Sequence, residues 1–266
     1  MQLTFCPLFS GSSGNCAYVE AGNTRILIDA GISGKAVTEA LAQIDVLPET
    51  IQGILITHEH SDHVKAAGIL SRKYRIPIYA NEPTWNAMAR QIGDVWPGQR
   101  RIFDSGEDFF IGNLSISSFQ IPHDAAEPVG YRVFAGGHSV STATDMGYLT
   151  RDVLKRISGS DIVLLESNHD PDMLLQNPRY SQTLKKRILG RFGHLSNEMC
   201  AEGILKLYET GVRHIVLGHL SAENNTPELA LETSVRAACD KGILIGQELF
   251  IDMAWRDRVG GLYTVE

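Results

Sequence analysis

The sequence contains 266 residues, of which 43% are hydrophobic and 21% charged, with a formal net charge of −7. This composition is typical of an ordinary globular protein that is long enough to bury a large core. The acidic balance argues against a protein that coats nucleic acid through its overall charge, although a local basic groove would still act over a Debye length of roughly 10 Å.

The sequence lacks the features of a membrane or secreted protein. No apolar run approaches the roughly 20 residues that a membrane-spanning helix needs. The first five residues begin as a strand, without the basic and then apolar order of a secretory signal. The four cysteines show no C-x-x-C pairing, which favours reduced thiols. We therefore expect a cytoplasmic protein without membrane contact.

In the first part of the chain, short apolar runs alternate with turn-forming residues and with helical patterns. The expected strands are 2–9, 15–21, 24–30, 51–56 and 77–80. The expected helices are 34–44, 62–74 and 82–90; Ser61 would cap the second, and Pro83 stands near the start of the third.

The second part continues this mixture of strands and helices. Residues 100–121 are rich in β-forming side chains, and further strands are expected at 129–135, 138–145, 161–166, 214–217 and 243–253. Helices are expected at 150–158, 181–190, 196–210 and 227–240. No linker or low-complexity segment marks a boundary, so residues 1–266 are predicted to form one layered α/β domain with its site along a sheet edge.

Four candidate metal ligands directly follow the predicted strand 51–56. They are His58, His60, Asp62 and His63. Imidazole nitrogens and carboxylate oxygens bind divalent ions such as zinc, and a loop at a strand end lets them converge while the sheet holds them in place. With nine histidines in the chain, three of them between positions 58 and 63 argue against a polar loop that is rich in histidine by chance.

Three further candidate ligands lie at or just after the ends of β-rich segments: His123, Asp145 and His219. Each alone is more often structural than a ligand, but with the first cluster they form a set of seven. The set divides over two metals, with His58, His60 and His123 on one, Asp62, His63 and His219 on the other, and Asp145 between them. Two divalent ions about 3.5–4 Å apart would hold a hydroxide and clamp a phosphoryl or carbonyl oxygen.

The pattern H-x-H-x-D-H at residues 58–63 resembles the signature of the metallo-β-lactamase fold, and His123, Asp145 and His219 match its later metal motifs in order and spacing. The resemblance covers essentially the whole chain. It implies a four-layer αββα sandwich with a dimetal site at the edge of two sheets. Asp145 stands where true β-lactamases have cysteine. An aspartate at this position is similar to that of the hydrolases of phosphodiesters, thioesters and lactones.

Further residues resemble the nuclease branch of this family. The stretch 193–198 is similar to the region of ribonuclease Z in which a histidine protonates the leaving oxygen; this implies that His194 is the proton donor and that Glu166 orients it. Asp62 would orient the nucleophile while serving as a ligand. Together with residues 10–16 and 166–170, the stretch resembles the bacterial YycJ/WalJ-type proteins, which implies a DNA exonuclease or another phosphodiesterase.

Several residues are candidate contacts for the substrate. Ser196 and Asn197 stand at a predicted helix N-terminus, where anions bind readily. The loop 10–15 is either a plain tight turn or a loop whose amides and hydroxyls contact phosphate. The complete set of candidates is Ser12, Ser13, Asn15, His169, Ser196 and Asn197.

The segment 176–192 carries five basic residues and no acidic one, namely Arg179, Lys185, Lys186, Arg187 and Arg191. It is either a solvated helix face or a positive face that guides a phosphate backbone. Tyr180 would stack on a base or, as for most isolated tyrosines, serve packing. The glycine- and proline-rich arm with which ribonuclease Z clamps tRNA is not visible, which argues against tRNA processing.

We therefore expect a nuclease, with DNA as the expected nucleic-acid substrate and two divalent ions as cofactors. Nitrogen and oxygen ligands without thiolate suit Zn²⁺ or Mn²⁺ equally. The main alternative is a hydrolase of a small thioester, lactone or cyclic phosphodiester. A di-iron redox protein is disfavoured because no flavodoxin-like domain is present, and a binding protein with structural metals is disfavoured because the ligand set is complete.

Overall fold

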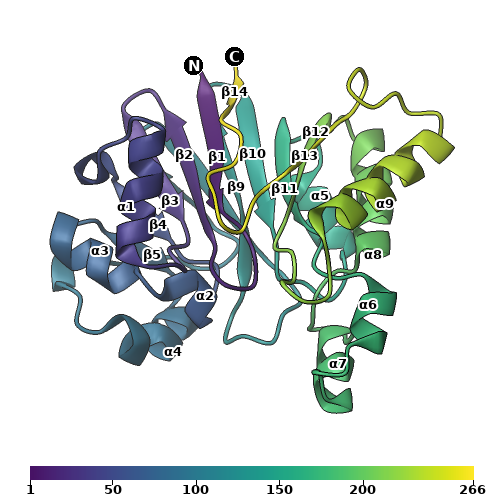
Figure 1. Cartoon of the computed structure of the whole chain (residues 1–266). Coiled ribbons are helices and arrows are strands. Elements are labelled where there is room, and N and C mark those ends of the chain that lie inside the picture. The colour runs from purple at the N-terminus through teal and green to yellow at the C-terminus, as the bar shows by residue number, and fades with distance from the viewer.

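Two seven-stranded sheets form the centre of the computed structural model, which describes residues 1–266 (Figure 1). The first sheet has the order β14 (Tyr263–Val265), β1 (Leu3–Phe9), β2 (Cys16–Ala21), β3 (Thr24–Ile28), β4 (Gly53–Leu55), β5 (Ile78–Ala80) and β6 (Arg100–Ile102). The second has the order β13 (Phe250–Met253), β12 (His214–Gly218), β11 (Ile162–Glu166), β10 (His138–Ala143), β9 (Val129–Ala135), β8 (Leu114–Gln120) and β7 (Asp108–Ile111).

Helices cover the outer face of each sheet, so that the sheets lie between two helical layers (Figure 1). The layer over the first sheet contains α1 (Gly34–Gln43), α3 (Ala67–Tyr74) and α4 (Glu82–Ile92). The layer over the second contains α5 (Arg151–Ile157), α8 (Asn197–Glu209) and α9 (Pro227–Asp240). Three short helices lie near the ends of strands, namely α2 (Ser61–Val64), α6 (Pro171–Gln176) and α7 (Gln182–Ile188), and 3₁₀ turns occupy Pro48–Thr50 and Pro97–Gln99.

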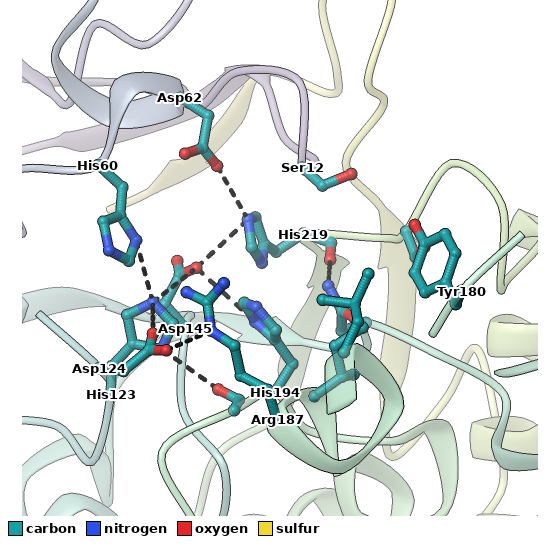
Figure 2. A pocket seen from close by; sticks show the side chains of 15 residues that line it. Ser12, His60, Asp62, His123, Asp124, Asp145, Tyr180, Arg187, His194 and His219 are labelled. Atoms are coloured by element: carbon teal, nitrogen blue, oxygen red, sulfur yellow. Dashed lines mark hydrogen bonds and ion pairs between the residues drawn. The ribbon is translucent and has the colours of Figure 1, made fainter. Parts of the chain in front are cut away.

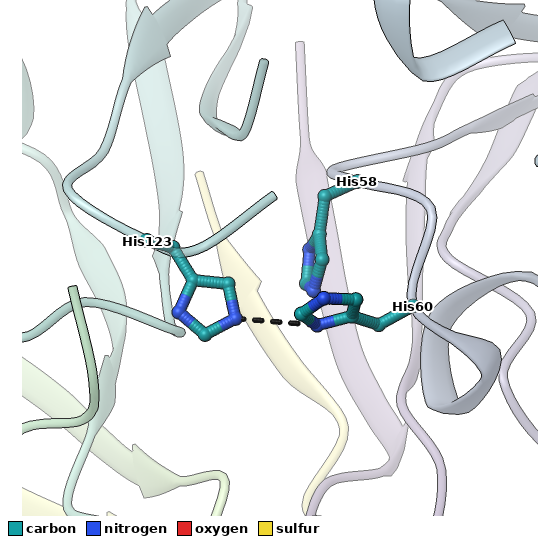
Figure 3. Close-up of side chains that lie close together, drawn as sticks. All are labelled: His58, His60 and His123. Carbon is teal, nitrogen blue, oxygen red and sulfur yellow. Dashed lines mark hydrogen bonds between the residues drawn. The ribbon is translucent and has the colours of Figure 1, made fainter. Parts of the chain in front are cut away.

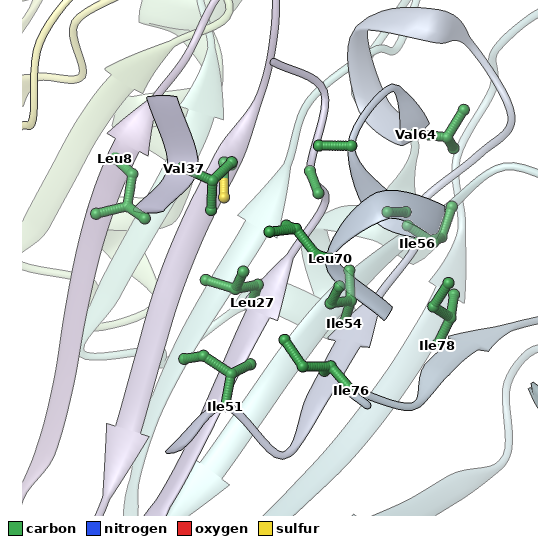
Figure 4. Close-up of a cluster of buried hydrophobic side chains, with 14 of the residues drawn as sticks. Leu8, Leu27, Val37, Ile51, Ile54, Ile56, Val64, Leu70, Ile76 and Ile78 are labelled. Atoms are coloured by element: carbon green, nitrogen blue, oxygen red, sulfur yellow. The ribbon is translucent and has the colours of Figure 1, made fainter. Parts of the chain in front are cut away.

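The alternation of side chains along the strands explains the layers. In β3, Leu27 points to the helical layer, whereas Ile26 and Ile28 point to the core between the sheets. In β12, Val216 faces the inter-sheet core and its neighbours face α8 and α9. Each fully buried aliphatic side chain contributes about 1.5–3 kcal/mol, and Figure 4 shows how such side chains fill the space between the first sheet and its helices. The αββα prediction is confirmed.

Parallel strands determine where the polar residues gather. Strands β3, β4 and β5 pair in parallel, and so do β10, β11, β12 and β13. The carboxyl ends of parallel strands meet at one edge of a sheet, so the segments that follow β3, β4, β10, β11 and β12 can converge. Every candidate metal ligand except His123 stands at the end of one of these strands or in the segment directly after it.

Several predicted elements differ from the observed ones. The predicted helix 62–74 is two helices, because Ala66 donates a backbone hydrogen bond to Ala30 (2.8 Å) and the chain turns between α2 and α3. Ser61 is the first residue of α2 rather than its cap; His60 occupies the cap position, and its side chain makes no hydrogen bond to the backbone of the helix. The last predicted strand, 243–253, is confined to β13 because residues 244–249 form a turn, and α6 and β14 were not predicted.

The four cysteines are all free thiols, three of them buried. No helix combines the length and the apolar character that crossing a bilayer would require.

Candidate metal centre

The seven predicted ligands lie together at the common edge of the two sheets. Their nitrogen and oxygen atoms form overlapping groups within which all atoms lie less than 4.8 Å apart. One group contains His58, His60 and His123, whose rings converge in Figure 3, with His60 Nδ1 3.3 Å from His123 Nε2. A second group contains Asp62, His63 and His219. Both groups correspond to predicted triads, but His58, His63 and Asp145 form a further group, so the division of the ligands over two ions stays a prediction.

Asp145 lies between the two triads. Its Oδ2 is 3.4 Å from Nε2 of His63, and its Oδ1 is 3.4 Å from Nε2 of His219. The same Oδ1 is 3.9 Å from Nε2 of His123, which belongs to the other triad. The carboxylate therefore lies within 3.9 Å of nitrogen atoms from both triads.

The backbone takes an unusual conformation to bring three acidic or basic side chains to this edge. Asp29, Asp145 and His219 each follow a strand, and each has a positive φ, of 62°, 61° and 56°. For a residue other than glycine, the left-handed region costs about 1–2 kcal/mol, so surrounding contacts must stabilise it. At His219 they are Ser10 Oγ, which accepts from the backbone N–H (2.9 Å), and Asn168 Nδ2, which donates to the carbonyl (2.8 Å).

A buried carboxylate orients His63. Asp29 Oδ2 lies 2.8 Å from Nδ1 of His63, and the same carboxylate accepts hydrogen bonds from the backbone N–H and the hydroxyl of Thr57 (2.9 Å each). With a proton held on Nδ1, the lone pair of Nε2 faces the cluster. Asp29 and Thr57 were not among the predicted site residues, although Asp29 ends a strand in the same way as Asp145.

Burial and neighbouring charges divide the histidines into two kinds. Burial lowers the pKa of His58 and of His123, so these imidazoles are neutral and suited to bind a cation. Burial also opposes protonation of His63 and His219, but the surrounding carboxylates outweigh it, Asp145 foremost, and raise the pKa of His219 to about 10. Burial raises the pKa of Asp62 and Asp145, yet the histidines reverse this and hold both below the ordinary value.

The donor atoms of this cluster fit divalent cations. Buried Nε2 of His58, Nε2 of His219 and Oδ2 of Asp145 have no hydrogen-bond partner. Such atoms cost about 1–3 kcal/mol each when left unpaired, and a divalent ion would use their lone pairs. All donors are imidazole nitrogens or carboxylate oxygens, a set that suits Zn²⁺ and Mn²⁺.

His194 and Glu166 form a hydrogen-bonded pair beside the cluster. Nδ1 of His194 lies 2.7 Å from Oε1 of Glu166, and Nδ1 of His219 lies 2.9 Å from the same oxygen. The other oxygen of Glu166 accepts from the backbone N–H groups of Met146 (2.8 Å) and Leu195 (3.2 Å). Glu166 is fully buried, so its charge is held by these contacts alone.

A pocket of about 230 Å³ opens over the cluster. Five candidate ligands line it, and the segment 180–188 adds Tyr180, Leu184, Arg187 and Ile188 to the lining. Figure 2 shows Arg187 beside Asp124, with Tyr180 further from the ligands. Arg187 is the only basic residue in the lining apart from histidines, and its Nε lies 2.5 Å from Oδ2 of Asp124. The pocket thus combines a metal-ligand cluster, a histidine–glutamate pair and one guanidinium.

Of the six predicted substrate contacts, Ser12 alone lines this pocket. Asn15 is buried and its Nδ2 lies 3.0 Å from Nε2 of His63. Ser196 caps α8, and Asn197 is bound to Ser167 and Asn225, so the chain itself uses the groups that were expected to bind an anion. Ser13 is exposed outside the lining, and His169 is buried with neither ring nitrogen hydrogen-bonded.

The basic segment 176–192 does not present one positive face. Arg179 pairs with Glu223 (3.4 Å), and Lys185 is buried with its ammonium donating to the carbonyl of Leu175 (2.6 Å). Arg191 donates to the hydroxyl of Tyr148 (3.2 Å). Only Arg187 reaches the pocket, because it lies on the face of α7 that covers the cluster.

Comparison with known proteins places this chain in a family. Residues 24–220 match the family model described as the beta-lactamase superfamily domain. The chain belongs to the metallo-β-lactamase superfamily, and it is a metal-dependent hydrolase of that fold.

Two bacterial relatives and one solved structure are especially similar. The exodeoxyribonuclease YycJ of Bacillus anthracis is 40% identical over 93% of each chain. The exodeoxyribonuclease WalJ of Streptococcus pneumoniae is 43% identical over 89% of each chain. The metallo-β-lactamase fold protein YhfI of Bacillus subtilis covers the full length of both chains with a TM-score of 0.73 at 15% identity, which shows the shared fold.

Proposed function

We propose that this protein is a DNA exonuclease that uses two divalent metal ions, Zn²⁺ or Mn²⁺. The observation that carries the proposal is the position of Asp145 between two ligand triads, in a pocket that also holds the His194–Glu166 pair. The two relatives described as exodeoxyribonucleases support a nucleic-acid substrate, and the identity of 40–43% supports DNA. Four free thiols and such a substrate fit a cytoplasmic location.

The proposed ligand assignment follows the two triads. His58, His60 and His123 would hold one ion, Asp62, His63 and His219 the other, and Asp145 both. When bound, the ions supply an activated water and positive charge for the phosphoryl oxygens. Asp62 is the least buried of the ligand carboxylates and lines the pocket, so it can also orient the attacking water.

His194 would protonate the leaving oxygen. Its Nδ1 donates to Glu166, so the proton that can be transferred is on Nε2. The pentacoordinate phosphorus expels an alkoxide, which is a poor leaving group until it receives this proton. Glu166 also fixes the ring orientation, since its own position is set by two backbone N–H groups.

Arg187 would contact a non-bridging phosphate oxygen. Its guanidinium is the only permanent cation in the lining and is now paired with Asp124 at the pocket wall. Asp124 contacts only Nε, so the remaining N–H groups of the guanidinium can bind an incoming phosphate while this pair persists.

A small-molecule hydrolase of the same fold is the second candidate. It is favoured by the apolar wall of Leu184 and Ile188, and by the size of the pocket, about 230 Å³. A thioester, lactone or cyclic phosphodiester would fill such a pocket without needing a path for a polymer.

The test compares substrates that differ in their leaving group. End-labelled single-stranded DNA, duplex DNA and RNA are incubated with protein loaded with zinc or with manganese, beside the His194→Ala and Asp145→Ala variants. Bis(4-nitrophenyl) phosphate serves as an ester whose leaving group needs no proton. Asp145→Ala should lose both activities, whereas His194→Ala should lose DNA shortening and retain most ester turnover.

Two results would contradict the proposal. Intact DNA and RNA with every metal would remove the nuclease function and direct attention to thioesters and lactones. Equal loss of DNA and ester turnover in His194→Ala would show that His194 does not act as a proton donor.

A further inference from the structure

A second groove adjoins the metal pocket on the side of the C-terminal segment. It has a volume of about 200 Å³. Its walls come from Ser10, the segment 220–227 and the segment 254–258, which we call the 254–258 loop. Ser221 lines both the groove and the metal pocket, and Ser12 lines the pocket two residues after Ser10 lines the groove. The two depressions are therefore neighbours that share Ser221 in their walls.

The contacts around this shared wall are fixed by backbone hydrogen bonds. Gly11 pairs with Leu220 as an isolated parallel bridge, which joins the 10–14 loop to the segment after His219. Ser10 N–H donates to the carbonyl of Trp255 (2.8 Å), and Ala254 N–H donates to that of Leu217 (2.8 Å). The backbone of the 254–258 loop is thus attached to β12, which His219 follows, and to Ser10 at the end of β1.

Two arginines of this loop have no acidic partner. Arg256 and Arg258 line the groove, both are exposed, and neither forms an ion pair within 4.0 Å. Arg256 packs over Gly11, where an added Cβ would meet its side chain at 3.1 Å. The guanidinium of Arg258 lies 3.7 Å from the centre of the Trp255 ring, and this stacking holds it in place. The one acid in the lining, Asp257, leaves an excess of positive charge.

We infer that this groove binds the phosphodiester backbone of the substrate strand next to the nucleotide that is cleaved. The inference rests on the proposed function, because a strand held in the metal pocket must leave it, and the groove is the neighbouring depression that shares Ser221 with that pocket. Arg256 and Arg258 are the unpaired cations that would contact the following phosphates. Because they contact phosphate and not bases, the groove would bind strands of any sequence.

The test measures how affinity depends on strand length. Phosphorothioate strands, which keep the charge and resist cleavage, are bound to metal-loaded protein as a dinucleotide and as a strand of about ten nucleotides. The variant is Arg256→Gln with Arg258→Gln. The control is Lys206→Gln with Arg236→Gln, which removes the same charge from exposed positions of α8 and α9 that line neither cavity.

The double variant of the groove should bind the longer strand about tenfold more weakly or worse. Loss of two phosphate contacts should also reduce the slope of log affinity against log salt by about 1.4. Binding of the dinucleotide and turnover of bis(4-nitrophenyl) phosphate should stay at the wild-type level, as should every property of the control.

The inference is overturned if the groove variant binds the longer strand as tightly as the control does. It is also overturned if dinucleotide binding and ester turnover fall by the same factor as binding of the longer strand, since the effect would then lie in the metal pocket. Length-dependent binding without cleavage of any strand would keep the groove and reject the nuclease, so the two proposals fail separately.

Discussion

Nδ1 of His194 lies 2.7 Å from Oε1 of Glu166, and Nδ1 of His219 lies 2.9 Å from the same oxygen. One buried carboxylate thereby couples the proposed proton donor to a proposed metal ligand. Its second oxygen is occupied by two backbone N–H groups. If either oxygen were replaced by an amide NH₂ group, that group would face N–H donors and could not accept their hydrogen bonds.

Glu166→Gln should therefore reduce kcat on DNA by about 10–100-fold, the usual effect of losing a carboxylate behind a ligand. The NH₂ group of the glutamine would face either the two histidines or the two backbone N–H groups. A buried group left without a hydrogen-bond partner costs about 1–3 kcal/mol in the free energy of unfolding. Steady-state kinetics and denaturant titration measure both effects. Glu202→Gln, on the exposed face of α8, is the control, and an unchanged kcat in Glu166→Gln would refute the role assigned to Glu166.

Asp29→Asn should lower metal affinity by about 10–100-fold while the fold persists. Asparagine tolerates the positive φ of this position. Its amide nitrogen would donate to Nδ1 of His63, which forces the ring proton onto Nε2 and removes the lone pair that faces the cluster. Competition with a chromophoric chelator measures the affinity. Wild-type affinity in a folded Asp29→Asn protein would show that His63 is not oriented in this way.

Gly31→Ala should disrupt the metal centre through the backbone. A Cβ at Gly31 would lie 1.5 Å from the carbonyl oxygen of Asp62, so the segment that carries Asp62 and His63 must move. The expected loss is about 3 kcal/mol in the free energy of unfolding, the upper range for overpacking, together with lost metal binding.

Gly34→Ala is the matched control for Gly31→Ala. It lies at the first position of α1, where a Cβ would meet Ile69 at an ordinary 3.5 Å. Metal content and thermal unfolding are compared for both variants. Full metal content in Gly31→Ala would contradict the close approach.

Arg187→Gln should raise KM for DNA, because the only guanidinium in the pocket is lost. The carboxylate of Asp124 would then remain unpaired near the bound phosphate and repel it. KM should become less sensitive to salt, by a slope of about 0.7 for one phosphate contact on a single strand. Arg179→Gln removes the same charge from a residue that pairs with Glu223 outside the pocket, and it should leave KM unchanged. Equal KM values for both variants would exclude a phosphate contact by Arg187.

Local patterns in the sequence predicted which side chains gather at the sheet edge, because motif and position agree. The pattern at 58–63 and the strand ends at Asp145 and His219 identify groups that a parallel arrangement brings to one edge. The division into triads followed from the alternation of the motif. The fold class followed from the resemblance carried by the same residues.

Contacts between distant segments could not be predicted in this way. The pairing of Arg187 with Asp124 joins residues 63 positions apart, and Asp29, which follows β3, contacts His63 in α2. The break between α2 and α3 depends on a backbone contact with Ala30, which outweighs helical periodicity. The basic segment was expected to be either a solvated helix face or a positive face that guides phosphate, but burial of Lys185 and local pairing of Arg179 and Arg191 divide it.

The three left-handed residues at the strand ends bear on how this protein can evolve. Glycine has no Cβ, so it would adopt the positive φ of Asp29, Asp145 and His219 with less conformational strain. Selection for thermal stability alone would therefore favour glycine at the positions where the chemistry resides. A library selected for heat resistance should therefore contain proteins that are more stable but have lost these metal-site side chains. Activity must be maintained by a separate selection, which opposes the backbone preference at these positions.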